Sequence, residues 1–181
     1  MKLSRVRLKR TTTISDFPKV SVNIQKRVPF VSVVGKKKSG KTTLIERLVY
    51  LLKLEGYKVG VMKHDVREFQ IDYKGKDTYR YYHSGADIVV ISSQEKVASI
   101  RRLKASPPLE ELLHTHFSDA DLVLIEGYKA DDCPKIFLLD PGEEPSLREK
   151  KDCLVLVKGD QSVPSSKDIE EALNFLKGLL Q

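Results

Sequence analysis

A nine-residue segment rich in glycine and lysine limits the fold more than any other feature. Its sequence is Gly35-Lys36-Lys37-Lys38-Ser39-Gly40-Lys41-Thr42-Thr43, which satisfies the spacing G-x-x-x-x-G-K-[ST]. The apolar run Phe30–Val34 comes directly before it and is typical of a buried strand. After it, apolar residues recur every three or four positions and predict a helix over Lys41–Glu55 that stops at Gly56. Strand, glycine loop and helix therefore follow one another in the order that a phosphate-binding loop, or P-loop, requires.

The P-loop predicts a binding site for a polyphosphate. Glycine lets backbone N–H groups approach phosphate oxygens, and the start of a helix adds positive partial charge. In this pattern Lys41 is predicted to contact the β- and γ-phosphates, and the Thr42 hydroxyl is predicted to bind Mg²⁺. Lys36, Lys37 and Lys38 either contact phosphate directly or remain solvated on an exposed turn. All nine residues of the loop are candidate nucleotide contacts.

Six short apolar runs divide the chain from Pro29 onward. They are Phe30–Val34, Val59–Met62, Ile88–Ile91, Leu122–Ile125, Ile136–Leu139 and Leu154–Val157. Continuous runs of this kind indicate strands that are buried on both faces. Helices are predicted between several of them, at Lys41–Glu55, Asp77–Ser84, Pro107–Phe117 and Ser166–Leu180. The expected fold is α/β, with a mostly parallel, doubly wound sheet and helices on both of its faces.

A carboxylate at the end of another apolar run is the second candidate for the metal side of the site. Leu122–Ile125 leads directly into Glu126, and ligands of parallel sheets bind at the carboxyl ends of the strands. Glu126 is therefore predicted to hold the hydration shell of Mg²⁺ or to position the attacking water. Asp121 precedes the same run and is expected at the opposite edge of the sheet.

Two segments late in the chain are predicted to be loops. Asp140–Asp152 contains two prolines and a glycine among charged residues, which is typical of an exposed connection. The last apolar run leads into Lys158-Gly159-Asp160, which is similar to the K-x-D part of the guanine-binding loop of GTPases but lacks the preceding Asn or Thr. If Asp160 faces the base, its carboxylate accepts from the N1–H and N2–H₂ groups of guanine and favours GTP over ATP. Otherwise Asp160 belongs to a polar turn after an edge strand.

The net charge of +7 is confined to the beginning of the chain. Residues 1–28 contain eight lysines and arginines and a single acidic residue, whereas basic and acidic residues balance in residues 29–181. We therefore predict a basic arm over residues 1–28 and a nucleotide-binding domain over residues 29–181. In the arm, Val20-Ser21-Val22-Asn23-Ile24-Gln25 alternates apolar and polar residues, as half-buried strands do. This β-like pattern fits packing on the domain, pairing with a second subunit or contact with a polyanion, and the three remain open.

Length and composition exclude several classes of protein. Apolar residues make up 40% of the chain, which is enough for one buried core. The longest apolar stretches run to about six residues, against roughly 20 for a membrane-spanning helix, and no block in the first 30 residues resembles a signal peptide. We therefore expect a cytoplasmic protein without a membrane partner. Cys133 and Cys153 are too few for a disulfide framework or a zinc cluster and are interpreted as isolated thiols.

Several of these segments together resemble the molybdopterin-guanine dinucleotide biosynthesis adapter family MobB. They are the P-loop, Lys63-His64 at the end of the second apolar run, Gly75-Lys76-Asp77, Gly85-Ala86 and Glu126-Gly127-Tyr128-Lys129. The resemblance covers roughly residues 29–181. The basic arm is not part of the family pattern.

The resemblance implies a homodimeric P-loop NTPase that binds GTP and Mg²⁺ and has weak GTPase activity. Its partner would be the guanylyltransferase that joins GMP to molybdopterin in molybdenum cofactor biosynthesis, with molybdopterin itself as a further candidate ligand. The family pattern places the strand-end acid on Glu126 and a residue near the nucleotide on His64, for contact with phosphate, Mg²⁺ or the partner's ligand. Without the resemblance, His64 is interpreted as a packed or surface residue, and Asp77 as the N-cap of a helix that begins at Thr78.

Hydrolysis by the isolated chain is expected to be slow. Lys41 and Mg²⁺ would neutralise the transferring phosphoryl group, with Glu126 near the water. No signature in the sequence indicates a water-positioning glutamine or a built-in arginine finger. This combination fits a carrier or a switch better than a metabolic enzyme of high flux.

Two other functions remain open. A small-molecule kinase would use Arg80, Arg101 and Arg102 as phosphate clamps, although the sequence contains no arginine-rich lid segment with flanking glycines. A nucleic-acid-binding module would use the basic arm, although Phe17 is the only aromatic residue there. Nucleic acid is therefore not expected as a partner.

Overall fold

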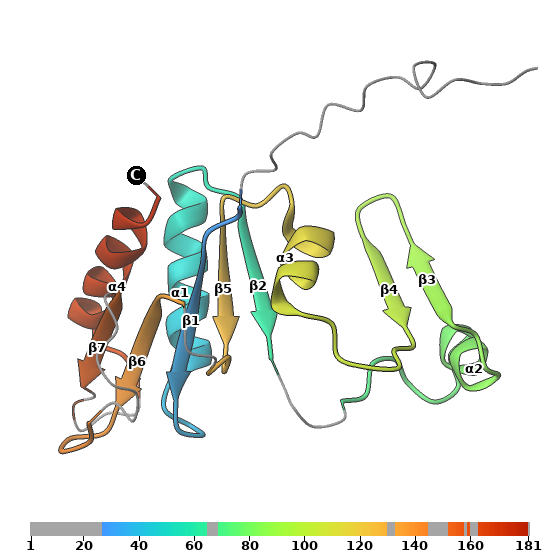
Figure 1. Cartoon of the computed structure of the whole chain (residues 1–181), viewed down its shortest axis with the longest axis horizontal. Coiled ribbons are helices and arrows are strands. Elements are labelled where there is room, and N and C mark those ends of the chain that lie inside the picture. Colours follow the sequence, from blue (N-terminus) through green and yellow to red (C-terminus); the bar gives the residue numbers. More distant parts are fainter. Residues whose placement is uncertain are drawn as a thin grey trace, which may run out of the picture.

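The computed structural model describes residues 27–64, 69–129, 133–144, 152–157, 159 and 163–180. Over these residues the main sheet has five parallel strands in the order β2-β5-β1-β6-β7 (Figure 1). The strands are β1 (Phe30–Gly35), β2 (Val59–Lys63), β5 (Leu122–Glu126), β6 (Lys135–Leu139) and β7 (Cys153–Val157). Each coincides with a predicted apolar run, and together they form the expected parallel sheet. The expected burial on both faces holds for β1, β5 and β6 but was wrong for β2 and β7, because these two strands lie at the edges of the sheet.

The register of the strands brings three strand ends to one edge of the sheet. In the pairing of β1 with β5, Val33 is opposite Glu126, and in the pairing of β1 with β6, Gly35 is opposite Leu138. On the other side of β5, Lys63 at the end of β2 is also opposite Glu126. Because the strands all run in one direction, these ends share the carboxyl edge, where ligands of such sheets bind.

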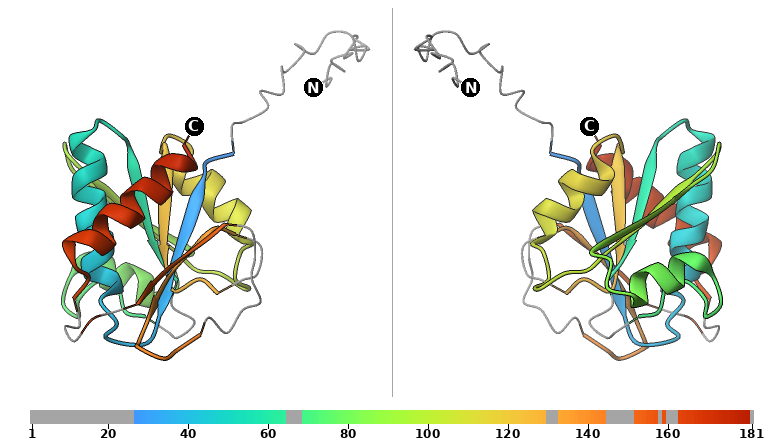
Figure 2. Two further views of the ribbon diagram at one scale, coloured as in Figure 1. Left: turned by 90° about the vertical axis from the view of Figure 1, so that its left-hand side faces the viewer. Right: turned by 90° about the vertical axis from the view of Figure 1, so that its right-hand side faces the viewer.

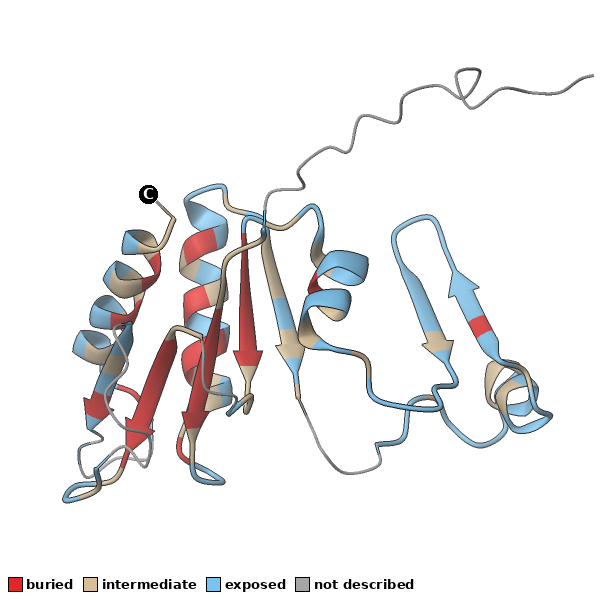
Figure 3. Cartoon of the chain, in the orientation of Figure 1, coloured by how far each residue is buried: buried red, intermediate tan, exposed pale blue. Residues whose placement is uncertain are grey.

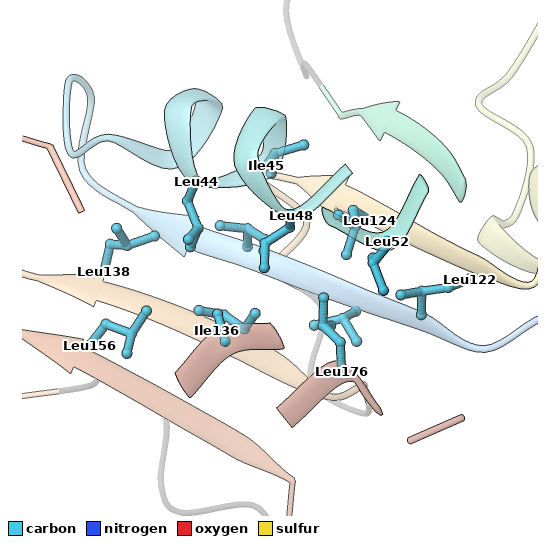
Figure 4. Close-up of a cluster of buried hydrophobic side chains, with 13 residues drawn as sticks. Leu44, Ile45, Leu48, Leu52, Leu122, Leu124, Ile136, Leu138, Leu156 and Leu176 are labelled. Carbon is cyan, nitrogen blue, oxygen red and sulfur yellow. The ribbon is translucent and has the colours of Figure 1, made fainter. Parts of the chain in front are cut away.

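Helices cover both faces of the main sheet, as predicted (Figure 2). They are α1 (Lys41–Leu54), α3 (Leu109–Phe117) and α4 (Ser166–Gly178). α1 and α4 pack on one face over a large cluster of aliphatic side chains, in which Leu48 and Leu176 are fully buried (Figure 4). α3 packs on the other face, where Leu113 clusters with Val123 and Ile125.

The ends of α1 and α4 follow from local sequence. α1 ends at Leu54, and the chain leaves it through Gly56, whose φ of +89° is the conformation that follows a helix C-terminus. The predicted stop of this helix is therefore confirmed. α4 begins with a capping box: the Ser165 hydroxyl accepts from Asp168 N at 3.2 Å, and the Asp168 carboxylate accepts from Ser165 N at 2.7 Å.

A smaller part of the protein, which we call the hairpin unit, lies beyond the β2 side of the main sheet (Figure 1). It consists of α2 (Asp77–His83), β3 (Ile88–Ser92) and β4 (Val97–Arg101), and its two strands are antiparallel. The prediction of a strand over Ile88–Ile91 was correct, but the expected burial on both faces within the parallel sheet was wrong. Ile88, Val90 and Ile91 are 46%, 56% and 58% exposed (Figure 3).

A tight turn explains why β3 does not enter the main sheet. Ser93 N donates to the Lys96 carbonyl oxygen at 2.9 Å, so the chain folds back at once and β3 pairs with its neighbour in sequence. A strand that joins a parallel sheet needs a crossover of a dozen or more residues instead. β4 was not predicted, because Val-Ala-Ser-Ile-Arg contains no continuous apolar run.

The start of α2 differs from the prediction by one residue. Its N-cap is Lys76, and Asp77 is the first helical residue, with its carboxylate 3.6 Å from the Arg80 guanidinium. The N-cap role predicted for Asp77 was therefore wrong. Instead the Asp72 carboxylate accepts from the Thr78 hydroxyl, and this hydrogen bond is the main reason why the pKa of Asp72 is lowered.

Residues 1–26 of the basic arm and Asp160 lie outside the described residues, so their predicted roles stay predictions. Arg27 and Val28 lead into β1, and Val28 is half-buried against the cluster below α3. Among the helices of the described segments, none has the length and apolar character that crossing a membrane requires.

Candidate functional site

The P-loop forms a tight connection between the end of β1 and the start of α1. A Cβ atom at Gly35 would lie 2.6 Å from Ser39 Oγ and 2.7 Å from the Leu138 carbonyl oxygen. Ser39 is buried, and its N–H donates to the Lys36 carbonyl oxygen at 3.2 Å. Gly40 precedes α1 with a φ of +87°. Close contact at Gly35 and positive φ at Gly40 thus explain both glycines of the motif.

The ammonium group of Lys41 lies against the backbone of the loop. Its Nζ donates to the Gly35 carbonyl oxygen at 3.1 Å and to the Lys36 carbonyl oxygen at 2.6 Å. Charged phosphate oxygens are stronger acceptors for an ammonium group than carbonyl oxygens are. Lys41 is therefore placed where it can exchange these carbonyl contacts for contacts with a polyphosphate.

The two residues predicted on the metal side of the site meet in the structure. Thr42 Oγ1, in the first turn of α1, donates to Glu126 Oε2, at the end of β5, at 3.4 Å. Thr42 is exposed and Glu126 is half-buried, so water has access to both. A hydroxyl and a carboxylate that leave room for water are the donor set that suits Mg²⁺ beside a phosphate. The residues present at this edge thus fit the predicted metal.

His64 follows β2 at the same edge. Its backbone N–H donates to the Glu126 carbonyl oxygen at 3.0 Å, and its ring stands edge-on to the Tyr128 ring with 5.3 Å between centroids. Between them, Gly127 adopts a φ of +86° and donates to the Val33 carbonyl oxygen at 3.0 Å. His64 therefore lies beside Glu126 at the carboxyl edge, and its ring packs on an aromatic neighbour; its predicted contact with phosphate, Mg²⁺ or the partner's ligand stays a prediction.

Ser32 stabilises the turn at this edge of the sheet, and it was not predicted as a site residue. Its side chain is fully buried in β1, and its hydroxyl donates to the Tyr128 carbonyl oxygen. The contact holds the turn that follows Glu126 against β1. A single polar residue inside the apolar run Phe-Val-Ser-Val-Val was the signal in the sequence.

Lys36 differs from the other lysines of the loop. Its ammonium forms an ion pair with the Glu143 carboxylate and lies 3.7 Å from Asp140 Oδ2. The hydrogen bond to Glu143 is the main reason why the pKa of Lys36 is raised, and the same bond lowers the pKa of Glu143. Lys37 and Lys38 are exposed, as the solvated interpretation predicts. Neither Glu143 nor Asp140 was predicted at the site.

Other predicted residues lie away from the P-loop. Asp121 accepts from Lys58 N at 2.8 Å at the amino edge of the sheet, opposite Glu126 as expected. In the hairpin unit, Arg80 pairs with Asp77, and Arg102 lies 4.3 Å above the Tyr82 ring. These contacts give two of the proposed kinase clamps a structural role within the hairpin unit.

Comparisons with known proteins agree on one family. The model of the family MobB, molybdopterin guanine dinucleotide synthesis protein B, matches residues 30–160. A molybdopterin-guanine dinucleotide biosynthesis adapter protein of Haemophilus influenzae is 34% identical over 113 residues, 62% of this chain and 64% of that protein. The corresponding protein of Escherichia coli is 32% identical over 122 residues, 64% of this chain and 67% of that protein. The matched segment thus spans slightly less than two thirds of the Haemophilus relative.

Solved structures give the same result. The crystal structure of Bacillus subtilis MobB has a TM-score of 0.65 at 27% identity, with 83% of this chain and 99% of that chain covered. A crystal structure of molybdopterin-guanine biosynthesis protein B has a TM-score of 0.64 at 32% identity, with 83% and 98% covered. Sequence, fold and the family match over residues 30–160 lead to one conclusion: the chain belongs to the MobB family.

Proposed function

We propose that the chain binds GTP with Mg²⁺ at the P-loop, hydrolyses it slowly, and serves as an adapter in molybdopterin guanine dinucleotide synthesis. The observation that carries this proposal is the contact of Thr42 with Glu126 at 3.4 Å, directly beside a P-loop whose Lys41 Nζ contacts the Gly35 carbonyl oxygen at 3.1 Å. The names of the relatives support the adapter role. We propose GTP rather than ATP as the nucleotide for two reasons. The chain resembles this family, and the K-x-D segment contains Asp160, whose carboxylate would accept from guanine.

The chain's own residues would divide the work at the phosphates. The N–H groups that follow Gly35 cradle the phosphate oxygens, and Lys41 neutralises the charge that develops on the transferring group. Thr42 and Glu126 would hold Mg²⁺ and its waters, which supplies further charge neutralisation. Glu126 also orients the attacking water. The sequence shows no signature of a water-positioning glutamine or a built-in arginine finger, so we expect turnover by the chain alone to be slow.

The partner in this proposal is the guanylyltransferase that joins GMP to molybdopterin. An adapter that holds GTP at the carboxyl edge of the sheet, where Lys63 of β2 is opposite Glu126 of β5, can present it to a second protein. Molybdopterin is the further candidate ligand. Binding of each is measured by adding transferase or molybdopterin to the GTP-loaded chain.

We also propose that the chain acts as a homodimer. The hairpin unit supports this, because Ile88, Val90 and Val97 stand exposed on one face of a two-stranded sheet. Adjacent exposed apolar side chains on a free sheet face are typical of an interface between proteins. A second copy of the same hairpin is a self-complementary partner for such a face.

Calorimetric titration with GTP and with ATP, with and without Mg²⁺, tests the nucleotide part of the proposal. Lys41→Ala removes an ammonium–phosphate contact and should lower the affinity for Mg-GTP by about tenfold to a hundredfold. Lys53→Ala, which removes an exposed lysine in the last turn of α1, is the matched control and should change the affinity little. Unchanged binding in Lys41→Ala would refute the proposed P-loop site. Equal affinity for ATP would refute the preference for GTP.

Glu126→Gln tests the metal side separately. The substitution keeps the shape of the side chain and removes its charge, so Mg²⁺ dependence and single-turnover hydrolysis should both weaken. Asp121→Gln, at the opposite edge of the sheet, should leave both unchanged. Rapid hydrolysis by the unsubstituted chain without a partner would contradict the adapter role.

A further inference from the structure

A hydrogen-bonded turn lies next to the P-loop. It follows β6 and has the sequence Asp140-Pro141-Gly142-Glu143. Glu143 N donates to the Asp140 carbonyl oxygen at 3.0 Å, and Gly142 has a φ of +81°. Proline at the second position and a positive-φ glycine at the third are typical of a type II turn. Because β6 pairs with β1 up to Gly35, the turn emerges at the same edge as the P-loop.

The turn fixes a carboxylate against the first lysine of the P-loop. One oxygen of Glu143 accepts from Asp140 N at 2.9 Å, and the other binds the Lys36 ammonium. Asp140 adds a second carboxylate 3.7 Å from the same ammonium. The Glu143 side chain is only 26% exposed, whereas that of Lys36 is 68% exposed. The Glu143 carboxylate is thus fixed by a hydrogen bond within its own turn as well as by the ion pair with Lys36.

The backbone of Lys36 also accepts two hydrogen bonds within the loop. Its carbonyl oxygen accepts from Ser39 N at 3.2 Å and from Lys41 Nζ at 2.6 Å. The ion pair restrains the side chain of Lys36. It therefore also restrains the residue whose carbonyl oxygen accepts from Ser39 and Lys41. A loop that is ordered before the ligand arrives loses less entropy when the ligand binds.

From these contacts we infer that Glu143 is a positioning residue of the nucleotide site, which holds Lys36 and so preorganises the P-loop for phosphate. The inference rests on the proposed function of the site. It assigns Lys36 to the support of the loop and not to the phosphates. It also gives the turn after β6, which no motif marks, a part in nucleotide affinity.

Glu143→Gln in the full-length chain tests the inference, with Mg-GTP affinity measured by calorimetry. The substitution removes the charge that binds Lys36, and the affinity should fall about three- to tenfold, in the range of a charged hydrogen bond at a partly exposed site. Glu144→Gln is the matched control, because Glu144 is an exposed glutamate next in the chain, and it should leave the affinity unchanged. If Glu143 acted only as a negative charge near an anion site, both variants would bind GTP more tightly, and the inference would be overturned.

A double-mutant cycle adds a readout that general destabilisation would not produce. Lys36→Gln should lower the affinity as much as Glu143→Gln, and the double variant should be no weaker than either single variant. Lys36→Arg keeps the ion pair and should retain most of the affinity. Additive losses, or a loss in Lys36→Gln beside a gain in Glu143→Gln, would show Lys36 to be a phosphate ligand and overturn the inference.

The outcomes also separate this inference from the proposed function. If Lys41→Ala weakens Mg-GTP binding as expected and Glu143→Gln does not change it, the inference alone fails. If the unsubstituted chain does not bind Mg-GTP, or if Lys41→Ala binds it normally, both fail together.

Discussion

The main sheet and the hairpin unit are both made of apolar strands, but only the main sheet has central strands that are buried on both faces, namely β1, β5 and β6. β5 is fully covered, with Leu122 and Leu124 against α1 and α4 and with Val123 and Ile125 toward α3. In the hairpin unit, Val89 is buried, whereas Val90 is 56% exposed. The first region owes its stability to its own helices. The second keeps an apolar face that another surface can cover.

The largest difference in unfolding free energy between the two regions is expected when a core side chain is truncated. Leu48→Ala empties space in the cluster between α1, α4 and the sheet, where Leu48 is fully buried. The free energy of unfolding should fall by about 2–5 kcal/mol, as measured by urea denaturation. Val97→Ala, at a position 69% exposed on β4, should change it by less than about 0.5 kcal/mol at a concentration where the chain is monomeric. Similar losses at both positions would contradict the comparison.

A smaller loss is expected where a strand of the main sheet touches α3. A Cβ atom at Gly60 of β2 would lie 2.4 Å from Cδ1 of Phe117, so Gly60→Ala must displace the ring. The expected cost is about 1–3 kcal/mol of unfolding free energy, as for other overpacked sites. Gly178→Ala is the control, because no atom lies within 4 Å of its Cβ position and alanine favours the helix. An unchanged melting temperature in Gly60→Ala would mean that α3 is not fixed against β2.

The same comparison explains which parts of the fold could be predicted from the sequence. The central strands β1, β5 and β6 were found because burial on both faces requires continuous apolar runs. The edge strands β2 and β7 also have apolar runs, although they are partly exposed. The apolar run at Ile88–Ile91 correctly predicted a strand but not the sheet to which it belongs, because an apolar run does not specify the strand with which it pairs. β4 was missed because its residues alternate weakly and it is stabilised by pairing with β3.

The residues of the candidate site likewise fall into those that the sequence predicts and those that it does not. The P-loop residues were predicted because their spacing along the chain is itself the geometry, and Glu126 because it ends a strand. Ser32 and Glu143 were not predicted, because each acts on a residue that is distant in sequence and becomes a neighbour only through strand pairing. Contacts of this kind depend on strand order, which the runs alone do not specify.

The smallest effect on the stability of the monomer, and the sharpest test of the homodimer, is expected from Val90→Lys. Val90 is 56% exposed on β3, opposite Ser99, so lysine has room in the isolated chain and the unfolding free energy should change by less than about 0.5 kcal/mol. In a dimer joined through this face the added charge would be buried without a partner, and sedimentation should show a dissociation constant raised at least about tenfold.

Gln94→Lys is the matched control for Val90→Lys, because it adds the same charge to the exposed turn between β3 and β4 and leaves the strand face intact. It should leave association unchanged. If Val90→Lys remained as dimeric as the unsubstituted chain, the proposed interface would be wrong. If it unfolded the monomer, the face would be one that the chain covers by itself, and the contrast between the two regions would disappear.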